Sequence, residues 1–458
     1  IMNLKLGNNW ATNNNGVPLN DSEVERYIAT VPSQRQIEHA KSPFYCFIHF
    51  GMNTATGREW GNATEKATDF DITNIDAKQW VSTLKQSGAE GIILTCKHHD
   101  GFCLWDTTAT DFSVMHSPYG QDIVKQVSYE CARQGMKFGV YLSPWDMHEK
   151  TYGKPEYNDY FCTQLGELLT NYGTIFEVWF DGAKGADAVA FEYDWERYYS
   201  LIRSLQPDAN IAICGPDIRW VGNEAGKCRK NEFSVVPQSL MHIRTIQEKS
   251  QQAENDTSKL KNLDSMDEDL GSRKILKESK ELAWFPAEVD VSIRKGWFHP
   301  GGNKVKSARR LFNIYINSVG NNCTLLLNVP PSREGVIDKK DSKSLKALGE
   351  KIKLVTAKPV LVQHFGELQK ENQYFDFNFD SAKKLKYCII SEDIAKSQRV
   401  EKFDLYLKKP NGGYKKAHSG TIIGSKKIIK LRGKATGAIF VIRQSRSTPV
   451  IDEIGFYE

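Results

Sequence analysis

The feature that most constrains this chain is an alternation of short apolar runs and amphipathic segments over most of its length. Continuous apolar runs between amphipathic segments are typical of a parallel sheet covered on both faces. The runs predicted to be strands are FYCFIHF, GIILTC, KFGVYLS, IFEVWFD, NIAICG, EFSVVP, WFPAEVDV and CTLLLNV. Their number predicts an α/β fold with a (β/α)8-like barrel, and a doubly wound open sheet is the alternative.

The segments between the predicted strands carry helix signals. Residues 75–88 and 122–135 are amphipathic and end at Gly88 and Gly135, and glycine is a common helix stop. A third helix, WERYYSLIRSLQP, is expected to end before Pro207. The polar stretch 247–280 is predicted to be a long, partly helical excursion between two barrel strands, without the aspartate spacing of a calcium loop.

The pattern changes after about Ala357. Short alternating runs such as YFDFNFD, KFDLYLK and AIFVIRQS are separated by Gly, Asn and Lys turns, which predicts an antiparallel β-sandwich. We therefore expect two domains, a catalytic barrel with an N-terminal extension over residues 1–356 and a β-sandwich over residues 357–458. The alternating aromatics of YFDFNFD favour a sandwich that shields the barrel over one that binds glycans by itself.

Composition narrows the possible partners. The net charge is only +5, from 61 basic and 56 acidic residues, and no recognised module accompanies the late lysines, so we expect no nucleic-acid partner. No apolar run approaches the roughly 20 residues of a membrane span. The nine cysteines form no CxxC pair, which favours buried free thiols over a zinc site. The compartment and the oligomeric state are left open by these observations.

Polar and aromatic residues cluster where the predicted strands end, which is where (β/α)8 barrels carry their active sites. In chain order they are His49, Glu59, Trp60, His98, His99, Tyr141, Trp145, Trp179, Asp181, Asp217, Arg219, Trp220, Glu224, Glu288 and Trp297. Each one alone fits a hydrogen-bonded core or capping role. Together they are hard to explain by stability, because every buried polar group costs free energy unless it is satisfied. We therefore expect a functional site at the barrel mouth.

Two chemistries fit this set of residues. Metal-dependent hydrolysis would use the histidines as ligands, but His98 and His99 are adjacent, so their side chains diverge if the strand continues. Glycoside hydrolysis would use two carboxyl groups, one attacking the anomeric carbon and one protonating the leaving oxygen. The mixture of histidine, tryptophan and carboxylate favours the glycosidase, for which we expect no metal and no cofactor.

Several motifs resemble those of glycoside hydrolase family 29, the retaining α-L-fucosidases. They are FIHFG, REWG, KHHDGFCLWDT, VYLSPWD, VWFDGA and SVGNNCTLLLNVPP, and the resemblance runs from about Phe44 to Gly349. WVGNEAG and PAEVDVSIRKGWFH resemble the branch that prefers α-1,3/1,4-linked fucose. The resemblance implies an exo-acting enzyme that removes terminal α-L-fucose from oligosaccharides or glycoconjugates, in a periplasmic or extracellular location.

The resemblance also implies a role for each candidate residue. Asp181 matches the nucleophile and Glu224 the acid/base, with Glu288 as the second candidate for the acid/base. The residues expected to hold the sugar or wall the pocket are His49, Glu59, Trp60, His98, His99, Tyr141, Trp179, Glu288 and Trp297. The alternatives are an exo-glycosidase acting on another galacto-configured sugar and a fucose-binding protein without catalytic activity.

Overall fold

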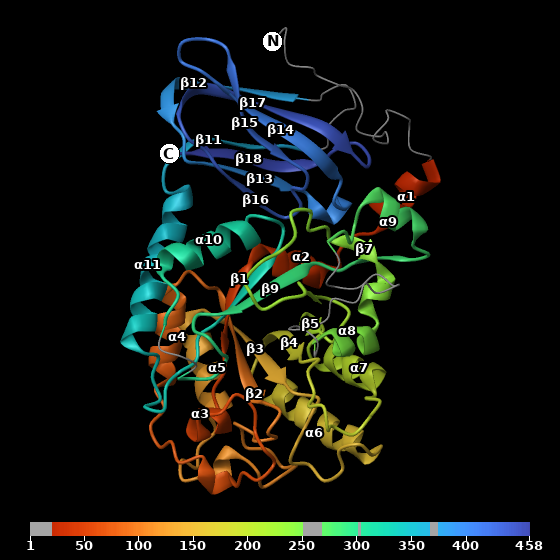
Figure 1. The fold of residues 1–458 in the computed structure, drawn as a ribbon, viewed down its shortest axis with the longest axis vertical. Coiled ribbons are helices and arrows are strands. Elements are labelled where there is room, and N and C mark those ends of the chain that lie inside the picture. Colours follow the sequence, from red (N-terminus) through yellow and green to blue (C-terminus); the bar gives the residue numbers. More distant parts are fainter. Residues whose placement is uncertain (1–20, 251–267, 301–303, 367–373) are drawn as a thin grey trace.

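The computed structural model describes residues 21–250, 268–300, 304–366 and 374–458. Within them, eight parallel strands form one sheet in the order β5-β4-β3-β2-β1-β10-β9-β6. These strands are β1 (Phe44–Ile48), β2 (Gly91–Lys97), β3 (Lys137–Leu142), β4 (Ile175–Phe180), β5 (Asn210–Ile213), β6 (Arg219–Trp220), β9 (Ala287–Ser292) and β10 (Thr324–Asn328). An isolated parallel bridge between Ala212 and Ile218 joins the two ends of this order, so the barrel is nearly closed. The predicted (β/α)8-like barrel is confirmed (Figure 1).

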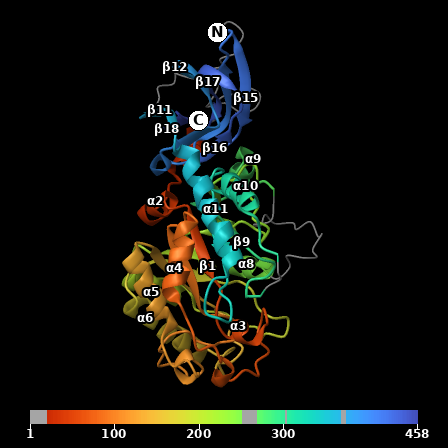
Figure 2. The same ribbon diagram turned by 90° about the vertical axis from the view of Figure 1, so that its left-hand side faces the viewer.

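Most of the helices surround the barrel, while α1 and α9 lie beside β7 near the sandwich (Figures 1 and 2). The helices are α1 (Asp21–Ala29), α2 (Gln34–Lys41), α3 (Met52–Thr56), α4 (Ala77–Gln86), α5 (Ile123–Gln134), α6 (Glu156–Asn171), α7 (Trp195–Leu205), α8 (Ile243–Ser250), α9 (Arg273–Glu278), α10 (Ala308–Ser318) and α11 (Lys339–Thr356). Asp76, Asp122 and Asp194 cap α4, α5 and α7, each accepting a backbone N–H of the first turn that would otherwise lack a partner. These are the three helices predicted above, and all three are confirmed.

One predicted barrel strand is wrong. The EFSVVP segment forms β7 (Val235–Pro237), which pairs antiparallel with β8 (Leu282–Trp284) outside the barrel. Phe233 and Val236 belong to a separate buried cluster with Ile422, and Val235 belongs to another with Trp284. The sixth barrel strand is instead the two-residue β6, which lies between the predicted strands NIAICG and EFSVVP. A strand of two residues is too short to show any periodicity, which is why the sequence pattern misses it.

The excursion between β6 and β9 is partly helical, as predicted. Helix α8 and helix α9 lie at its two ends, and residues 251–267 of the predicted stretch lie outside the described residues. The predicted strand WFPAEVDV is split at Pro286 into β8 and β9. Proline lacks the N–H that a central strand donates to its neighbour, so the split falls there.

The C-terminal strands form two antiparallel sheets, β11-β18-β13-β16 and β12-β17-β14-β15, which confirms the predicted β-sandwich. The strands are β11 (Pro359–His364), β12 (Tyr374–Lys384), β13 (Tyr387–Glu392), β14 (Val400–Lys408), β15 (Tyr414–Gly420), β16 (Lys427–Lys430), β17 (Lys434–Ser445) and β18 (Ile451–Tyr457). Their inner faces share a core that contains Phe377, Phe403, Phe440 and Phe456. Helix α11 ends at Thr356 and β11 begins at Pro359, and a division into two domains at this point stays a prediction.

The sandwich touches the barrel through β16 and the end of α10, which lie side by side in both views (Figures 1 and 2). The Ile428 N–H donates to the Gly320 carbonyl at 3.0 Å, and the Asn322 N–H donates to the Lys426 carbonyl at 3.0 Å. Among the described helices, none has both the length and the apolar character needed to cross a bilayer. All nine cysteines are free, and those predicted to be buried, Cys46, Cys96, Cys214 and Cys323, are buried.

Candidate active site

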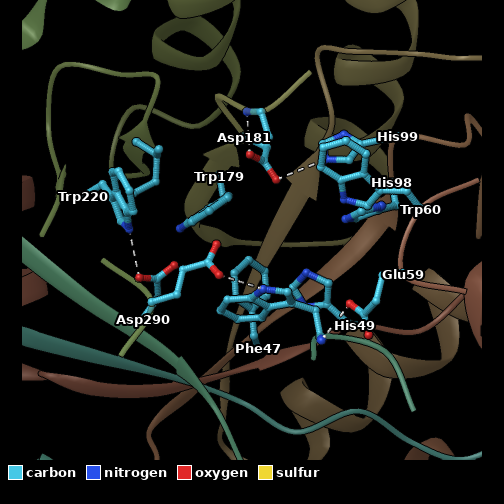
Figure 3. Close-up of a pocket in the computed structure, with 14 residues that line it drawn as sticks. Phe47, His49, Glu59, Trp60, His98, His99, Trp179, Asp181, Trp220 and Asp290 are labelled. Atoms are coloured by element: carbon cyan, nitrogen blue, oxygen red, sulfur yellow. Dashed lines mark hydrogen bonds and ion pairs between the residues drawn. The ribbon is translucent and has the colours of Figure 1, made fainter. Parts of the chain in front are cut away.

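A pocket with a volume of about 120 Å³ opens at the carboxyl ends of the barrel strands. Its lining residues are Phe47, His49, Glu59, Trp60, His98, His99, Trp179, Asp181, Ala183, Ile213, Trp220, Glu224, Asp290 and Trp297 (Figure 3). Every residue given a catalytic or sugar-binding role by the resemblance is among them except Tyr141 and Glu288. Of the other strand-end candidates, Trp220 lines the pocket, whereas Trp145, Asp217 and Arg219 do not. A pocket of this size has room for one small polar ligand.

Asp181 follows the last residue of β4 and is surrounded by hydrogen-bond donors. One carboxylate oxygen accepts the Tyr141 hydroxyl at 2.8 Å, and the other accepts the Ala183 N–H at 2.9 Å. His99 Nε2 lies 3.6 Å from the first oxygen (Figure 3). Burial, and then the charge of Asp181, raise the pKa of Tyr141 well above its usual range, so Tyr141 keeps its proton and donates it. Although Tyr141 does not line the pocket, it positions the carboxylate that does.

The three pocket histidines are buried and neutral. Burial lowers the pKa of His49 to about 3 and lowers the pKa values of His98 and His99 as well. His49 Nδ1 lies 2.8 Å from the Asn328 side-chain oxygen, so this ring nitrogen carries the proton and donates it. His98 Nδ1 is buried and has no hydrogen-bond partner among the described residues.

Glu224 lies on the loop that follows β6, in which Gly222 and Gly226 both adopt positive φ values of 109° and 74°. Glycine adopts this conformation without the steric cost that other residues meet. The Glu224 side chain is exposed at the pocket rim and accepts the Trp297 indole N–H at 3.3 Å. The backbone N–H of Trp297 in turn donates to Glu59 at 2.9 Å. Glu59 therefore anchors the segment that holds Glu224.

Glu288 does not reach the pocket, contrary to its predicted role in substrate binding or as the alternative acid/base. Its side chain is fully buried beneath Trp179, whose indole N–H donates to it at 2.8 Å, and the Tyr45 hydroxyl donates to its other oxygen. Burial, and then the nearby Glu177, raise its pKa well above the usual range. The geometry gives Glu288 the role of holding Trp179 in place.

Sequence reasoning missed Asp290, which lines the pocket two residues beyond Glu288 on β9. Side chains two positions apart share one face of a strand, and Asp290 lies about 6.6 Å nearer the carboxyl end, where the pocket is. That spacing is the signal that could have found it. Trp220, a strand-end residue with no predicted role, donates its indole N–H to Asp290 at 3.0 Å (Figure 3). Burial, and then the charges of Glu224 and Glu288, raise the pKa of Asp290 well above its usual range.

A metal ion could be held by His98, His99 and Asp181, because one donor atom of each lies within 4.8 Å of the others. Both oxygens of Asp181 already accept hydrogen bonds, however, from Tyr141 and the Ala183 backbone. The hydrogen-bonding capacity of Asp181 is therefore met on both oxygens without a cation. The arrangement can therefore place an anionic carboxylate, neutral imidazoles and a second, rim-exposed carboxyl group around one small polar ligand.

Comparison with known proteins agrees with this chemistry. A family model described as Alpha-L-fucosidase matches residues 52–355. Alpha-L-fucosidase 1 of Arabidopsis thaliana is 33% identical over an alignment 467 residues long. The alignment covers 94% of this chain and 88% of that protein. A candidate alpha-L-fucosidase from Bacteroides ovatus is 41% identical, with a TM-score of 0.86 over 95% of this chain and 75% of that one. A Ruminococcus gnavus GH29 fucosidase in complex with fucose is 28% identical, with a TM-score of 0.78 over 94% of this chain and 95% of that one.

Proposed function

This chain belongs to the α-L-fucosidase family, glycoside hydrolase family 29, and from this premise we propose a retaining mechanism in which Asp181 is the nucleophile and Glu224 the acid/base. As a member of this family it is a glycoside hydrolase that acts on α-L-fucosides. The observation that carries the mechanism is that Asp181 and Glu224 line the same small pocket. For a retaining pair, we expect the two carboxyl groups to lie roughly 5–5.5 Å apart in the complex with substrate.

In the first step, an Asp181 oxygen attacks the anomeric carbon of fucose and forms a covalent fucosyl ester. The bond to the leaving oxygen breaks, and protonated Glu224 donates its proton to that oxygen. The hydrogen bonds from Tyr141 and Ala183 support this role, because they hold the Asp181 carboxylate in one orientation before the attack.

In the second step, ionised Glu224 removes a proton from a water molecule, and the water oxygen attacks the anomeric carbon of the ester. The bond to Asp181 breaks and the carboxylate is released, so the second inversion restores the original configuration. The exposed position of Glu224 at the rim supports its role, since it must meet first the leaving saccharide and then water.

The neutral histidines are suited to sugar hydroxyls. A neutral imidazole offers one acceptor and one donor without bringing a charge that competes with Asp181. His49, His98 and His99 all line the pocket, and we expect them to bind the fucose hydroxyls. Trp60 is exposed at the rim, and the Trp297 ring centroid lies 5.2 Å from that of His49. The two tryptophans supply apolar faces for the ring and methyl group of the sugar.

The proposed substrate is a terminal fucose on an oligosaccharide or glycoconjugate, with an α-1,3 or α-1,4 linkage. The small volume of the pocket supports removal of one terminal sugar, and the motif around Glu224 supports the linkage. We also propose a periplasmic or extracellular location, where such glycans are met. Fractionation of the producing cells tests the location, and most of the activity is expected outside the cytoplasm.

Chemical rescue tests the two catalytic roles. The experiment measures 4-nitrophenol release from 4-nitrophenyl α-L-fucoside by wild type, Asp181→Gly and Glu224→Ala, with and without azide. We expect Asp181→Gly to be inactive and to form β-fucosyl azide when azide replaces the missing carboxylate. Glu224→Ala is expected to form α-fucosyl azide, because azide attacks the fucosyl ester in place of water.

Other outcomes would change the assignment. Wild-type activity of Glu224→Ala on both the aryl fucoside and oligosaccharides would remove Glu224 from the mechanism and move the search to Asp290. Faster hydrolysis of an aryl glycoside of another galacto-configured sugar would favour the rival exo-glycosidase. Binding of fucosides without any turnover would favour a binding protein, and loss of activity on chelation would favour a metal hydrolase.

A further inference from the structure

A second, wider cleft lies where the barrel meets the sandwich. Its volume is about 760 Å³. The backbone segment 225–230 forms one wall, helix α10 and the turn after it form the second, and strand β16 forms the third (Figures 1 and 2). No aspartate or glutamate is among its lining residues, and its basic lining residues are Lys227, Arg229, Lys230, Arg310, Lys427 and Lys430.

One cysteine, Cys228, lines this cleft. All nine cysteines lie in the described ranges, and Cys228 and Cys162 are partly exposed while the other seven are buried. Cys228 and Cys162 are therefore the two thiols that a reagent in solvent can reach. Their surroundings differ, because basic side chains surround Cys228 whereas burial raises the pKa of Cys162.

The buried thiol of Cys323 lies next to Cys228. The two sulfur atoms are within 4.8 Å of one another. The Asn321 side-chain N–H donates to Cys228 Sγ at 3.3 Å, and the Cys228 thiol, while protonated, donates to the Asn317 carbonyl at 3.1 Å. A disulfide needs a sulfur–sulfur distance of about 2.05 Å, and a change of rotamer moves a cysteine sulfur by about 3 Å. The two sulfur atoms are therefore close enough to bond after one side chain turns.

The two thiols differ in how readily they ionise. The hydrogen bond from Cys323 lowers the pKa of Cys228, and the Asn321 side chain and the Lys427 ammonium act in the same direction, against burial and the charge of Glu232. Burial raises the pKa of Cys323 well above its usual range. Cys228 thus ionises first, and Cys323 keeps its proton and donates it to the Cys228 sulfur. A partly exposed thiolate among positive charges is the reactive form of cysteine.

A metal ion is the alternative use of this pair, because one Glu232 oxygen lies within 4.8 Å of both sulfur atoms. Glu232 is already paired with Arg219 at 2.8 Å and with Arg229 at 3.3 Å. The Lys427 ammonium also acts on both sulfur atoms. These cations would repel a metal ion, so the surroundings favour a bond between the two sulfur atoms.

We propose that Cys228 and Cys323 form a disulfide by exchange with a small disulfide such as oxidised glutathione. The Cys228 thiolate attacks one sulfur of the small disulfide, whose sulfur–sulfur bond breaks and releases one small thiolate. Cys323 then gives up its proton and attacks the Cys228 sulfur, and the second small thiolate leaves. The two cysteines lose two electrons and two protons, and the small disulfide gains them and becomes two thiols.

The new bond would fasten the segment that carries Glu224 to the turn before β10. Cys228 is four residues beyond Glu224, and the bond to Cys323 closes a loop of about 95 residues. Such a loop limits the freedom of the unfolded chain, so we expect oxidised wild type to have a higher Tm than reduced wild type. Equal Tm values would overturn this restraint. The disulfide itself does not depend on the catalytic role proposed for Glu224.

Mass spectrometry after treatment with oxidised glutathione tests the proposal. The folded proteins are wild type, Cys323→Ser and Cys162→Ser, and their remaining thiols are blocked after denaturation. We expect wild type and Cys162→Ser to lose two thiols and to give peptides linked through Cys228 and Cys323. Cys323→Ser is expected to stop at a mixed disulfide of Cys228 with glutathione, because the second thiol is missing. Dithiothreitol should reverse all these changes.

Alkylation by iodoacetamide compares the two accessible thiols within one protein. At pH 7 we expect Cys228 to react about tenfold faster than Cys162, because a larger share of Cys228 is thiolate. Lys427→Gln should slow the alkylation of Cys228 and leave that of Cys162 unchanged.

Three results would overturn the proposal. The first is that all nine thiols remain after glutathione treatment of wild type, or that glutathione is found on Cys162 alone. The second is equal alkylation rates of Cys228 and Cys162. The third is stoichiometric binding of Zn²⁺ that Cys323→Ser abolishes, which would favour a metal site at this pair.

Discussion

At the residue scale, Glu288 and Asp290 lie two positions apart on β9 and meet different surroundings. Glu288 is enclosed by Tyr45, Trp179 and Glu177, so no ligand reaches it. Asp290 faces the pocket, with Trp220 on one oxygen and Glu224 close enough to influence its ionisation. The position along one strand therefore decides the role of each carboxyl group. Glu288 holds a residue of the pocket wall, whereas Asp290 lines the pocket directly.

This difference leads to a prediction about the pH dependence of catalysis. Asp290 and Glu224 repel one another when both are ionised, so the pair keeps its last proton to a higher pH than either carboxyl group would alone. Asp290→Asn removes this repulsion. We expect the alkaline limb of kcat/KM on an oligosaccharide, where the general acid loses its proton, to move to lower pH in the variant.

A pH–rate profile of wild type, Asp290→Asn and the surface control Asp106→Asn checks this expectation. Asp106 is exposed and lies outside the pocket lining, so its variant should follow wild type. An unchanged alkaline limb in Asp290→Asn would show that Asp290 does not share the titration of the acid.

A second buried carboxyl group predicts how stability depends on pH. Burial raises the pKa of Glu177 from its ordinary 4.5 to about 8, and burial lowers the pKa of its partner His39 to about 4. The two side chains are 2.7 Å apart. At pH 7 both are then neutral, and the carboxylic acid donates to the ring nitrogen. Between pH 4.5 and 8 the folded chain retains the Glu177 proton that the unfolded chain has lost, whereas His39 has the opposite effect between pH 4 and 6.5, where only the unfolded chain holds its proton.

The sign of the effect follows from that proton. The contribution of Glu177 to the free energy of unfolding is complete below pH 4.5 and is lost as the pH rises toward 8. We expect the Tm of wild type to fall from pH 5 to pH 8 by more than the Tm of Glu177→Gln, which keeps a hydrogen-bond donor but has no proton to lose. Thermal unfolding at the two pH values measures this, and equal falls in the two proteins would contradict it.

At the element scale, we compare two glycines that lie inside helices and therefore have the same low helix propensity. Replacement by alanine is predicted to lower the stability of the protein at one position and to raise it at the other. A Cβ at Gly349 of α11 would lie 1.9 Å from the Gln86 carbonyl oxygen at the end of α4, whereas a Cβ at Gly166 of α6 meets nothing within 4 Å. We expect Gly349→Ala to lower stability by about 1–3 kcal/mol through overpacking. Gly166→Ala should raise it by about 0.5–1 kcal/mol, because alanine loses less backbone entropy on folding.

Thermal unfolding of the two variants beside wild type tests the pair of predictions. A lower Tm for Gly349→Ala and a higher Tm for Gly166→Ala are the expected results. If Gly349→Ala also raised the Tm, α11 would be free to move away from α4, and helix propensity alone would account for both positions.

At the scale of the whole molecule, the sandwich covers apolar surface that belongs to the barrel and its excursions. Ile422 of the sandwich shares a buried cluster with Phe233, and the buried guanidinium of Arg446 lies 4.5 Å from the Phe233 ring centroid. Ser397 also donates to the Thr30 carbonyl at 2.7 Å. These contacts favour the shielding role that the sequence predicts for the sandwich.

A truncation tests how far the barrel depends on this cover. We expect a chain ending at Thr356 to aggregate or to unfold at a lower temperature than the full chain, because Phe233 and its neighbours would be exposed to water. Size-exclusion chromatography and thermal unfolding of both chains provide the measurement. A monodisperse truncated chain with the Tm and kcat/KM of the full chain would instead support a barrel domain that is stable by itself.

The sequence by itself determined the barrel, the sandwich, the family and most of the residues that line the pocket. Those conclusions rest on local properties, namely the period of apolar residues, the turn residues and the polar side chain at the end of each strand, as at His49 and Asp181. Only the tertiary structure decided that β6 replaces EFSVVP in the barrel, that Asp290 rather than Glu288 faces the pocket, and that six basic side chains from three distant segments line one cleft. Depth of burial along a strand and the convergence of distant segments depend on long-range packing, which no local pattern encodes.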